Sequence, residues 1–467
     1  MFKTEVYQNR RRRLVRQFEK GLILLLGNGE SPINAFDNCY RFRQDSSFLY
    51  FCGLDRPGLA LLMDVDEGRD ILVGEEQTEE DVIWSGLQPP LQEHAEQSGL
   101  HATASRDVLK GILRVALDAG RVVHYLPSCR AENVLLLAEL LDQSPSFVRE
   151  CASKALIRAV VALRSVKGLE EIDELEAAAD MGCQLQAAAM QMAVPGVYEW
   201  QVAGALEAVA VRTGRALSFP PIVTTHGEIL HNRQRDKPLC AGDLLLVDCG
   251  VESRLHYASD HTRTIPIGGV FTSRQRDIYQ VVLMCMEQAR ELIRPGIAYL
   301  EVHRATCRTL VSGLQDLQLM RGDAEQAVAL GAHALFMPHG LGHMLGLDVH
   351  DMEDLGEDYV GYDEKIRRSS QFGLSALRLG RVLEEGFVLT VEPGLYFIPS
   401  LIEQWKNADR HAEFINYTKL SEYLDFGGIR LEDDLLVTAG GNRLLGRPIP
   451  LGMDAIENRT GRSLDDV

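Results

Sequence analysis

The stretch Leu244-Leu-Leu-Val-Asp-Cys-Gly250 decides how the rest of the chain is interpreted. Its four consecutive apolar residues predict a buried strand, and Asp248 lies where that strand ends. A second acidic residue, Asp260, follows twelve positions later. Two buried carboxylates would repel each other and raise each other's pKa unless a cation lay between them. The stretch therefore predicts a metal site whose further ligands come from elsewhere in the chain.

Three downstream segments carry polar side chains in apolar surroundings. Residues 339–350 hold three histidines among glycines, which let the backbone approach a site closely. Residues 387–396 form an apolar run that contains a carboxylate and a Pro-Gly turn, and residues 428–437 form a strand pattern with a carboxylate inside it. A charge is rarely buried alone, so each segment is expected to supply a ligand. The candidates are His343, Glu392 and Glu432, with His339 and His350 as further residues of the site loop.

The resulting set of four carboxylates and one imidazole consists mostly of hard oxygen ligands. Such a set suits two divalent ions, most readily Mn²⁺, with Co²⁺ or Zn²⁺ as alternatives. Bridging carboxylates would hold the two ions a few ångströms apart, and a water or hydroxide between them would be a nucleophile near neutral pH. The ligand set therefore predicts a dinuclear hydrolytic centre.

In order and in motif context, these five residues resemble the ligands of the pita-bread metallopeptidases, the family of methionine aminopeptidase, Xaa-Pro aminopeptidase and prolidase. The resemblance implies an α/β (α+β) catalytic domain with an internal pseudo-two-fold axis around an antiparallel sheet. Family members usually have one residue fewer between the two aspartates, and we expect the extra residue in the turn at 252–256. The resemblance assigns Asp248 to one metal, His343 and Glu392 to the other, and Asp260 and Glu432 to bridging positions.

A faint internal repeat supports this fold. Residues 181–192 are helix-like and lead through Pro195-Gly196 to an amphipathic helix, and residues 278–293 lead in the same way through Pro295-Gly296. The two turns are 100 residues apart. Two halves of similar order around one sheet would gather the ligands between them.

The N-terminal part carries a second resemblance. Residues 40–53 are similar to the signature of the creatinase-type domain that precedes the catalytic domain in Xaa-Pro aminopeptidase and prolidase. Strand-like residues 59–63 and 70–73 and helix-like residues 131–141 predict a smaller α/β fold there. We therefore expect an N-terminal domain at residues 1–152 and a catalytic domain at 153–467. A helical pattern over 155–192, interrupted at 165–168, would open the latter.

The family resemblance also assigns residues to catalysis. His231 and His350 match active-site histidines, and neutral imidazoles suit proton transfer and stabilisation of an oxyanion. Glu392 would serve both as ligand and as proton shuttle. Arg430 would fix a ligand carboxylate from the same strand face as Glu432, and Tyr396 would play a similar part.

Three further residues are predicted to contact the substrate. His339 matches a histidine near the pocket wall, and Phe219 with the two prolines after it lies where the family places an apolar wall. Such a wall suits proline, because an X-Pro amide lacks an N–H and has restricted geometry. Arg378 matches an arginine that recognises the substrate carboxylate in prolidase, although Xaa-Pro aminopeptidases carry one there too.

The predicted function is hydrolysis of the bond between an N-terminal residue and a following proline. The segment at 40–53 favours an Xaa-Pro aminopeptidase, whereas the long insertion between Glu392 and Glu432 resembles prolidase, an Xaa-Pro dipeptidase. A metal-free relative, either a creatinase-like hydrolase or a binding module, would have lost several ligands, and this chain keeps all five. The family also implies a homodimer or homotetramer.

The composition is that of an ordinary globular protein. The chain has 467 residues, of which 46% are hydrophobic, and this length predicts two domains. Its net charge of −19 argues against nucleic acid and anionic membranes as partners. No apolar run approaches the roughly 20 residues of a membrane span. Nine cysteines without CxxC pairs predict reduced core residues of a cytoplasmic protein. Disorder is expected only after about residue 442.

Three local features have competing interpretations. The basic cluster at residues 10–13, with Arg16, is interpreted as the solvated face of an opening helix rather than a targeting signal. Cys249 should point to the strand face opposite Asp248, so it is not expected to be a thiolate ligand. Trp84 is either a packing anchor or a loop residue that contributes to another subunit's site.

Overall fold

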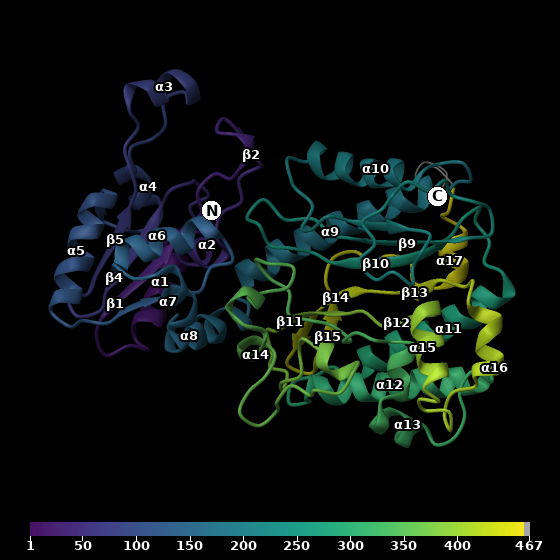
Figure 1. The fold of residues 1–467 in the computed structure, drawn as a ribbon. Coiled ribbons are helices and arrows are strands. Elements are labelled where there is room, and N and C mark those ends of the chain that lie inside the picture. Colours follow the sequence, from purple (N-terminus) through teal and green to yellow (C-terminus); the bar gives the residue numbers. More distant parts are fainter. Residues whose placement is uncertain (462–467) are drawn as a thin grey trace. The chain divides into compact units, whose positions relative to one another are not determined.

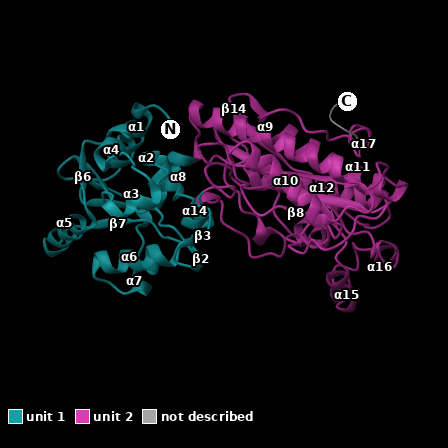
Figure 2. Ribbon diagram, turned by 90° about the horizontal axis from the view of Figure 1, so that it is seen from above, with its two compact units in different colours: residues 1–164, 352–359 teal, residues 165–351, 360–467 magenta. Residues whose placement is uncertain are grey.

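The computed structural model describes residues 1–461 of the chain. Contacts divide the described residues into unit 1, residues 1–164 with 352–359, and unit 2, residues 165–351 with those from 360 onward (Figure 2). Among residues 1–461 no helix combines the length and the apolar character needed to cross a membrane.

Unit 1 is built on a mixed five-stranded sheet in the order β6-β5-β4-β1-β7 (Figure 1). The central strand β1 is an uninterrupted apolar run and pairs antiparallel with β4 and parallel with β7. This arrangement agrees with the predicted α/β fold of the N-terminal part. The strands of unit 1 are β1 (Leu22–Leu26), β2 (Pro32–Ala35), β3 (Asn38–Cys39), β4 (Ala60–Asp64), β5 (Arg69–Val73), β6 (Ala102–Ala104) and β7 (Val123–Tyr125).

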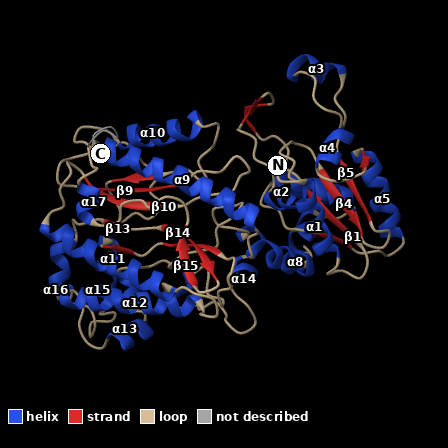
Figure 3. Ribbon diagram, turned by 180° about the vertical axis from the view of Figure 1, so that it is seen from behind, coloured by secondary structure: helices blue, strands red, loops and turns tan. Residues whose placement is uncertain are grey.

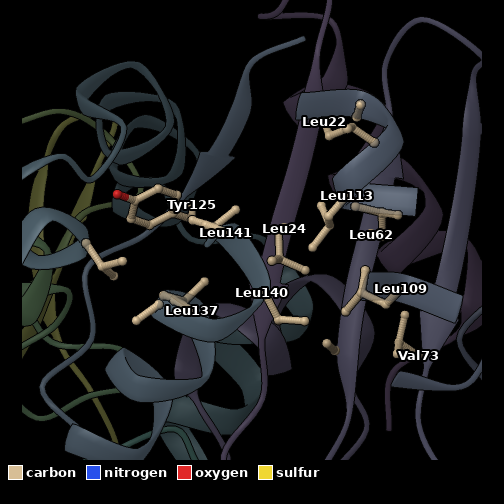
Figure 4. Close-up of a cluster of buried hydrophobic side chains, with 14 of the residues drawn as sticks. Leu22, Leu24, Leu62, Val73, Leu109, Leu113, Tyr125, Leu137, Leu140 and Leu141 are labelled. Atoms are coloured by element: carbon tan, nitrogen blue, oxygen red, sulfur yellow. The ribbon is translucent and has the colours of Figure 1, made fainter. Parts of the chain in front are cut away.

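Helices cover this sheet and supply the other side of its core. Leu109 and Leu113 of α5 and Leu137 of α6 pack with Leu24 and Leu62 of the sheet (Figure 4). These helices are amphipathic, so their apolar faces are buried against the strands. The helices are α1 (Thr4–Val15), α2 (Ser46–Cys52), α3 (Glu79–Ser85), α4 (Leu91–Gln97), α5 (Arg106–Asp118), α6 (Ala131–Leu141), α7 (Pro145–Glu150) and α8 (Lys154–Ser165), with η2 (Glu353–Leu355) and α14 (Glu357–Val360) from the later segment.

Helix α1 corrects part of the interpretation of the basic cluster as a solvated face, because Arg12, Arg13 and Arg16 are exposed as predicted but the other two arginines are not. Arg10 and Arg11 are buried, with exposed fractions of 4% and 2%. The Arg11 guanidinium donates to the carbonyls of Phe51 and Ser98, at 2.8 and 2.9 Å, and to the carboxylate of Asp70 at 3.1 Å. The cluster therefore anchors the first helix, and it does so because guanidinium groups can satisfy several buried acceptors at once.

Unit 2 repeats one pattern twice, a helix pair followed by antiparallel strands (Figure 3). In Figure 1 the strands lie between the pair α9–α10 and the pair α11–α12. The first half contains α9 (Leu169–Met192), α10 (Glu199–Arg212), β8 (Ile222–Thr224), β9 (Leu244–Cys249) and β10 (His261–Pro266). The second contains α11 (Ser273–Leu292), α12 (Tyr299–Asp316), α13 (Ala324–Leu330), η1 (Ala332–Leu335), η3 (Leu374–Ala376), β11 (Val388–Val391), β12 (Gly394–Tyr396), α15 (Pro399–Asn407), α16 (Tyr417–Leu420), η4 (Ser421–Tyr423), β13 (Gly428–Arg430), β14 (Asp433–Thr438), β15 (Gly441–Leu444) and α17 (Met453–Glu457).

The two Pro-Gly turns are structurally equivalent. Gly196 and Gly296 both have positive φ, +90° and +87°, which favours glycine. Each donates its N–H to a distant carbonyl, Gly196 to Leu239 at 2.8 Å and Gly296 to Leu383 at 2.9 Å. The internal repeat predicted from the sequence is therefore present in the backbone.

Two expectations about the C-terminal part are wrong. Glu432 does not lie inside a strand, because β13 ends at Arg430 and β14 begins at Asp433. In the break, the Glu432 N–H donates to the carbonyl of Thr262 at 3.0 Å, which turns the residue toward β10. The chain after residue 442 is also ordered through β15 and α17, since those elements pair and pack. The final residues of that expectation, 462–467, lie outside the described part.

The cysteines and Trp84 also differ from expectation. All nine cysteines lie in the described part and are free, but Cys129, Cys151 and Cys240 are exposed rather than in the core. Trp84 lies on α3 with 81% of its surface exposed, so it does not anchor packing within this chain.

Candidate dinuclear metal centre

Strand pairing in unit 2 brings the five predicted ligands together. Asp248 lies on β9 opposite Thr262 of β10, and Asp260 directly precedes β10. Glu392 directly follows β11, and the break before β14 places Glu432 beside Thr262, whose hydroxyl donates to its carboxylate at 2.7 Å. Residues nearly 200 positions apart thus meet at the ends of paired strands.

The ligand atoms fall into two overlapping groups. Within each group, one potential ligand atom per residue lies within 4.8 Å of the others. Glu432 belongs to both groups, and Asp260 Oδ2 lies 3.4 Å from His343 Nε2, so Asp260 also faces both. A carboxylate that bridges two metal ions must lie near the other ligands of both ions, and Glu432 and Asp260 meet this requirement. The groups are Asp248, Asp260 and Glu432, and His343, Glu392 and Glu432.

The buried carboxylates of this cluster need positive charge nearby if they are to be ionised. Asp248 Oδ1 and Asp260 Oδ1 are buried and have no hydrogen-bond partner among residues 1–461. Burial, reinforced by Asp248, raises the pKa of Asp260 well above its ordinary value, and burial with Asp260 raises that of Glu432 in the same way. Burial also raises the pKa of Glu392 to about 7. The donor set therefore fits a pair of divalent cations, which would stabilise the ionised carboxylates.

His343 is held in the orientation that a metal ligand needs. Its Nδ1 donates to the carbonyl of Met344 at 3.0 Å, which leaves Nε2 as the acceptor facing Asp260. Its backbone N–H donates to the hydroxyl of Thr390 at 3.2 Å. A ligand imidazole is commonly fixed through its other nitrogen in this way.

Arg430 binds a ligand carboxylate, as predicted, but the carboxylate lies on another strand than the strand-face argument implied. Its Nη2 donates to Asp248 Oδ2 at 2.7 Å, its Nη1 to the Tyr396 hydroxyl at 3.0 Å, and its Nε to the Thr262 hydroxyl at 3.3 Å. The sequence interpretation placed Arg430 beside Glu432 on one strand face. The break after β13 removes that alternation, so the guanidinium reaches a carboxylate on β9 instead.

A hydrogen-bonded chain continues from Arg430 to His339. His339 Nδ1 donates to the carbonyl of Gly340 at 2.7 Å, so its Nε2 accepts from the Tyr396 hydroxyl at 2.9 Å. Burial, followed by the charge of Arg430, lowers the pKa of His339 to about 4. The imidazole is therefore neutral near pH 7, as both hydrogen bonds require.

The predicted catalytic and substrate residues line one cavity of about 520 Å³ above the ligands. Arg378 Nη1 donates to His350 Nδ1 at 3.0 Å, and burial, followed by the charge of Arg430, lowers the pKa of His231. One wall is apolar and consists of Phe219 and the residues that follow it. The cavity brings together His231, His339, His350, Arg378, Phe219 and the five ligands.

Sequence reasoning missed the residues that support this centre. Thr262 and Thr390 bind ligands through hydroxyl groups, but an isolated threonine in a strand carries no signal of such a role. Lys167 and Asp351 form a buried ion pair at 2.8 Å, with both side chains 1% exposed. Asp351 directly follows the candidate residue His350, and this position was the one feature of the sequence that pointed to a supporting role for Asp351.

Comparisons with known proteins agree with this geometry. The sequence profile described as Metallopeptidase family M24 matches residues 173–439, and that of the aminopeptidase P N-terminal domain matches residues 7–124. The chain belongs to metallopeptidase family M24. The fold class predicted from the sequence is thereby confirmed, since solved structures of the family match the whole chain.

Relatives within family M24 cover nearly the full length of the chain. The Xaa-Pro aminopeptidase of Escherichia coli K12 is 32% identical over 94% of this chain and 93% of its own, and that of Haemophilus influenzae is 29% identical over 97% and 96%. The structure of proline aminopeptidase P II from Yersinia pestis has a TM-score of 0.80 at 30% identity, covering 98% of this chain and 99% of its own. A zinc-substituted E. coli aminopeptidase P in complex with product matches equally well, at 0.80 and 30%.

Proposed function

We propose that this chain is a metal-dependent Xaa-Pro aminopeptidase, which hydrolyses the bond between an N-terminal residue and a following proline. The observation that carries the proposal is the cluster of buried carboxylates on the floor of a cavity with one apolar wall. Full-length relatives named Xaa-Pro aminopeptidase support the same substrate class.

The proposed cofactor is a pair of divalent ions, with Mn²⁺ the first to test because the ligands are mostly carboxylates. When bound, such a pair lowers the pKa of a water molecule and polarises the scissile carbonyl. We assign Asp248 to one ion, His343 and Glu392 to the other, and Asp260 and Glu432 to both. The two overlapping groups of ligand atoms support this division.

The chain's own residues would then move protons and bind the substrate. Glu392 lines the cavity as a carboxylate, and we assign it to accept a proton and return it to the leaving proline nitrogen. His231 and His350 line the cavity as neutral donors for the developing oxyanion. Phe219 offers an apolar surface to the proline ring, and His339 is fixed at the wall by Tyr396.

Arg378 supports a second candidate, an Xaa-Pro dipeptidase. A guanidinium in the cavity can bind the free carboxylate that directly follows proline in a dipeptide. Its contact with His350 places this positive charge beside a residue that faces the ligands. In an aminopeptidase the same arginine would instead contact the peptide carbonyl after proline.

The experiment that tests the proposal compares Gly-Pro with longer Gly-Pro-Pro peptides, after chelator treatment and with Mn²⁺ restored. Cleavage of both substrates supports the aminopeptidase, whereas cleavage of the dipeptide alone identifies a dipeptidase. The Asp260→Ala variant should lose metal-dependent turnover. Cleavage that does not need a metal, or no cleavage, would overturn both functions.

Three further assignments accompany the proposal. The division into a domain at residues 1–152 and a catalytic domain at 153–467 stays a prediction, as does a cytoplasmic location. The family resemblance supports a homodimer or homotetramer.

A further inference from the structure

A second cluster of metal-binding side chains lies in the core of unit 2, outside the carboxylate-rich centre. His303 and Cys307 are one turn apart on α12, so they share one face of the helix, and His333 comes from η1. One ligand atom from each lies within 4.8 Å of the others. All three side chains are buried, with exposed fractions of 1%, 0% and 0%.

The polar atoms of this cluster are poorly satisfied. His333 has no hydrogen-bond partner on either ring nitrogen among residues 1–461, and His303 has none on Nδ1. The closest polar contact joins Cys307 Sγ to His303 Nε2 at 3.5 Å. Buried imidazole nitrogens without partners are unfavourable, so a core that keeps them calls for an explanation.

The geometry points to a ligand that would satisfy these atoms. In a tetrahedral site with metal–sulfur and metal–nitrogen bonds of about 2.3 and 2.0–2.1 Å, sulfur and nitrogen ligands are about 3.5 Å apart. The observed separation of Cys307 Sγ and His303 Nε2 has this value. We propose that His303, Cys307 and His333 form a buried three-ligand site for one thiolate-binding metal ion, Cu⁺ or Zn²⁺.

Charge distinguishes the two ions. One thiolate neutralises Cu⁺ completely, whereas Zn²⁺ would leave one net positive charge in the core. A net charge in the core is unfavourable, and the two nearby guanidinium groups are already paired, Arg304 with Glu301 at 2.9 Å and Arg308 with Glu325 at 3.3 Å. A histidine that binds a metal does so as a neutral imidazole, so the two histidines add no charge to the site. The site therefore favours Cu⁺ over Zn²⁺.

A spectroscopic test separates this site from the candidate catalytic centre. Protein is produced in cultures supplemented with Co²⁺, a spectroscopic substitute for Zn²⁺, and purified as the full chain. The five carboxylate and imidazole ligands contain no sulfur, so a thiolate-to-cobalt charge-transfer band in the near ultraviolet comes from a cysteine and not from the candidate catalytic centre. The substitution of Cys307 then decides whether that cysteine is Cys307. Zinc-type binding predicts this band in the wild type, its loss in Cys307→Ser, and its retention in Cys285→Ser. Cys285 is a matched control, because it is equally buried and contacts the carbonyl of Thr306 at 3.6 Å.

A second arm tests Cu⁺ with copper-supplemented cultures and anaerobic purification. Cu⁺ binding predicts about one more copper ion per chain in the wild type and Cys285→Ser than in Cys307→Ser. If Cys307→Ser fails to fold, His333→Gln replaces it, since it keeps the thiol and removes one ligand. A folded wild type with neither the cobalt band nor the additional copper would overturn the proposal and identify the cluster as a thiol–imidazole contact in the core.

Discussion

At the scale of single residues, Arg430 determines the geometry of the candidate centre. Its three donor contacts hold Asp248, Tyr396 and Thr262 together, and Tyr396 in turn holds His339. A lysine would keep the charge but could not form this planar fork of donors. The position of Asp248 therefore depends on guanidinium geometry as well as on charge.

We predict that Arg430→Lys weakens Mn²⁺ binding or lowers kcat/KM by about 10–100-fold, the range typical for residues that orient metal ligands. Titration of chelator-treated enzyme with Mn²⁺, followed by peptide hydrolysis, measures both. Arg447→Lys is the matched control, because Arg447 is 61% exposed and contacts Asp180 at 3.4 Å. Equal metal affinity and turnover in Arg430→Lys and wild type would show that the fork has no such role.

The residue scale also shows how far sequence alone can go. Asp248, Asp260, His343, Glu392 and Glu432 stand in recognisable motifs, and the structure brings them together. The support from Thr262 depends on the break between β13 and β14, which lets Glu432 reach β10. Residues 428–437 fit the pattern of a single strand in the sequence, and that pattern does not locate the break. Contacts that depend on such long-range pairing could not be predicted.

At the scale of elements, buried ion pairs fix segments that sequence patterns leave undefined. Lys167 lies in the short connection between α8 and α9, and its ammonium group reaches Asp351 at 2.8 Å. Asp351 also accepts from the N–H of Asp348 at 3.3 Å. The pair thereby holds the end of the loop that carries His343 and His350.

We predict that Lys167→Met lowers kcat/KM by up to about 10²-fold, because displacing a site loop by an ångström can have that effect. Steady-state kinetics on an Xaa-Pro peptide measure the loss, with circular dichroism to verify folding. Lys154→Met, at the exposed start of α8, should leave the kinetics unchanged. Wild-type kinetics in folded Lys167→Met would contradict a role of the pair in positioning the loop.

Helix α1 offers a second test at this scale. Arg11→Ala should destabilise unit 1 by about 3 kcal/mol, because it leaves buried carbonyl acceptors and Asp70 without their donor. Arg12→Ala removes an exposed neighbour on the same helix and should change stability by less than about 0.5 kcal/mol. Urea unfolding followed by circular dichroism compares the two variants. Equal urea-unfolding midpoints for the two variants would contradict an anchoring role of Arg11 and would support the solvated helix face predicted from the sequence.

At the scale of the whole molecule, the internal repeat is the feature that sequence conveyed best. Helices α9 and α11 end at residues 192 and 292, and α10 and α12 begin at residues 199 and 299. Such an offset survives in sequence because each turn needs glycine at a positive φ. The sheet between the halves buries the carboxylates, and that burial couples the stability of the fold to metal and pH.

We predict that metal-free protein loses stability as pH rises, whereas metal-loaded protein does not. In the folded metal-free state burial raises the pKa of Glu392 to about 7, and it raises the pKa values of Asp260 and Glu432 well above their ordinary values. The folded state therefore holds these protons more tightly than the unfolded state. Their contribution to stability is complete below about pH 4 and is lost as pH rises toward 7 and beyond. Glu392 alone accounts for a loss of about 3 kcal/mol.

Bound divalent ions favour the ionised carboxylates, so the difference in stability between metal-loaded and metal-free protein should widen with pH. Thermal unfolding at pH 5.5 and pH 8, with Mn²⁺ or with chelator, measures this difference. In Glu392→Gln the stability difference between metal-loaded and metal-free protein should increase less from pH 5.5 to pH 8, because an amide does not titrate. Asp454→Asn should not, since that carboxylate is 88% exposed. If the difference were the same at both pH values, the buried carboxylates would not be the groups that link metal binding to folding.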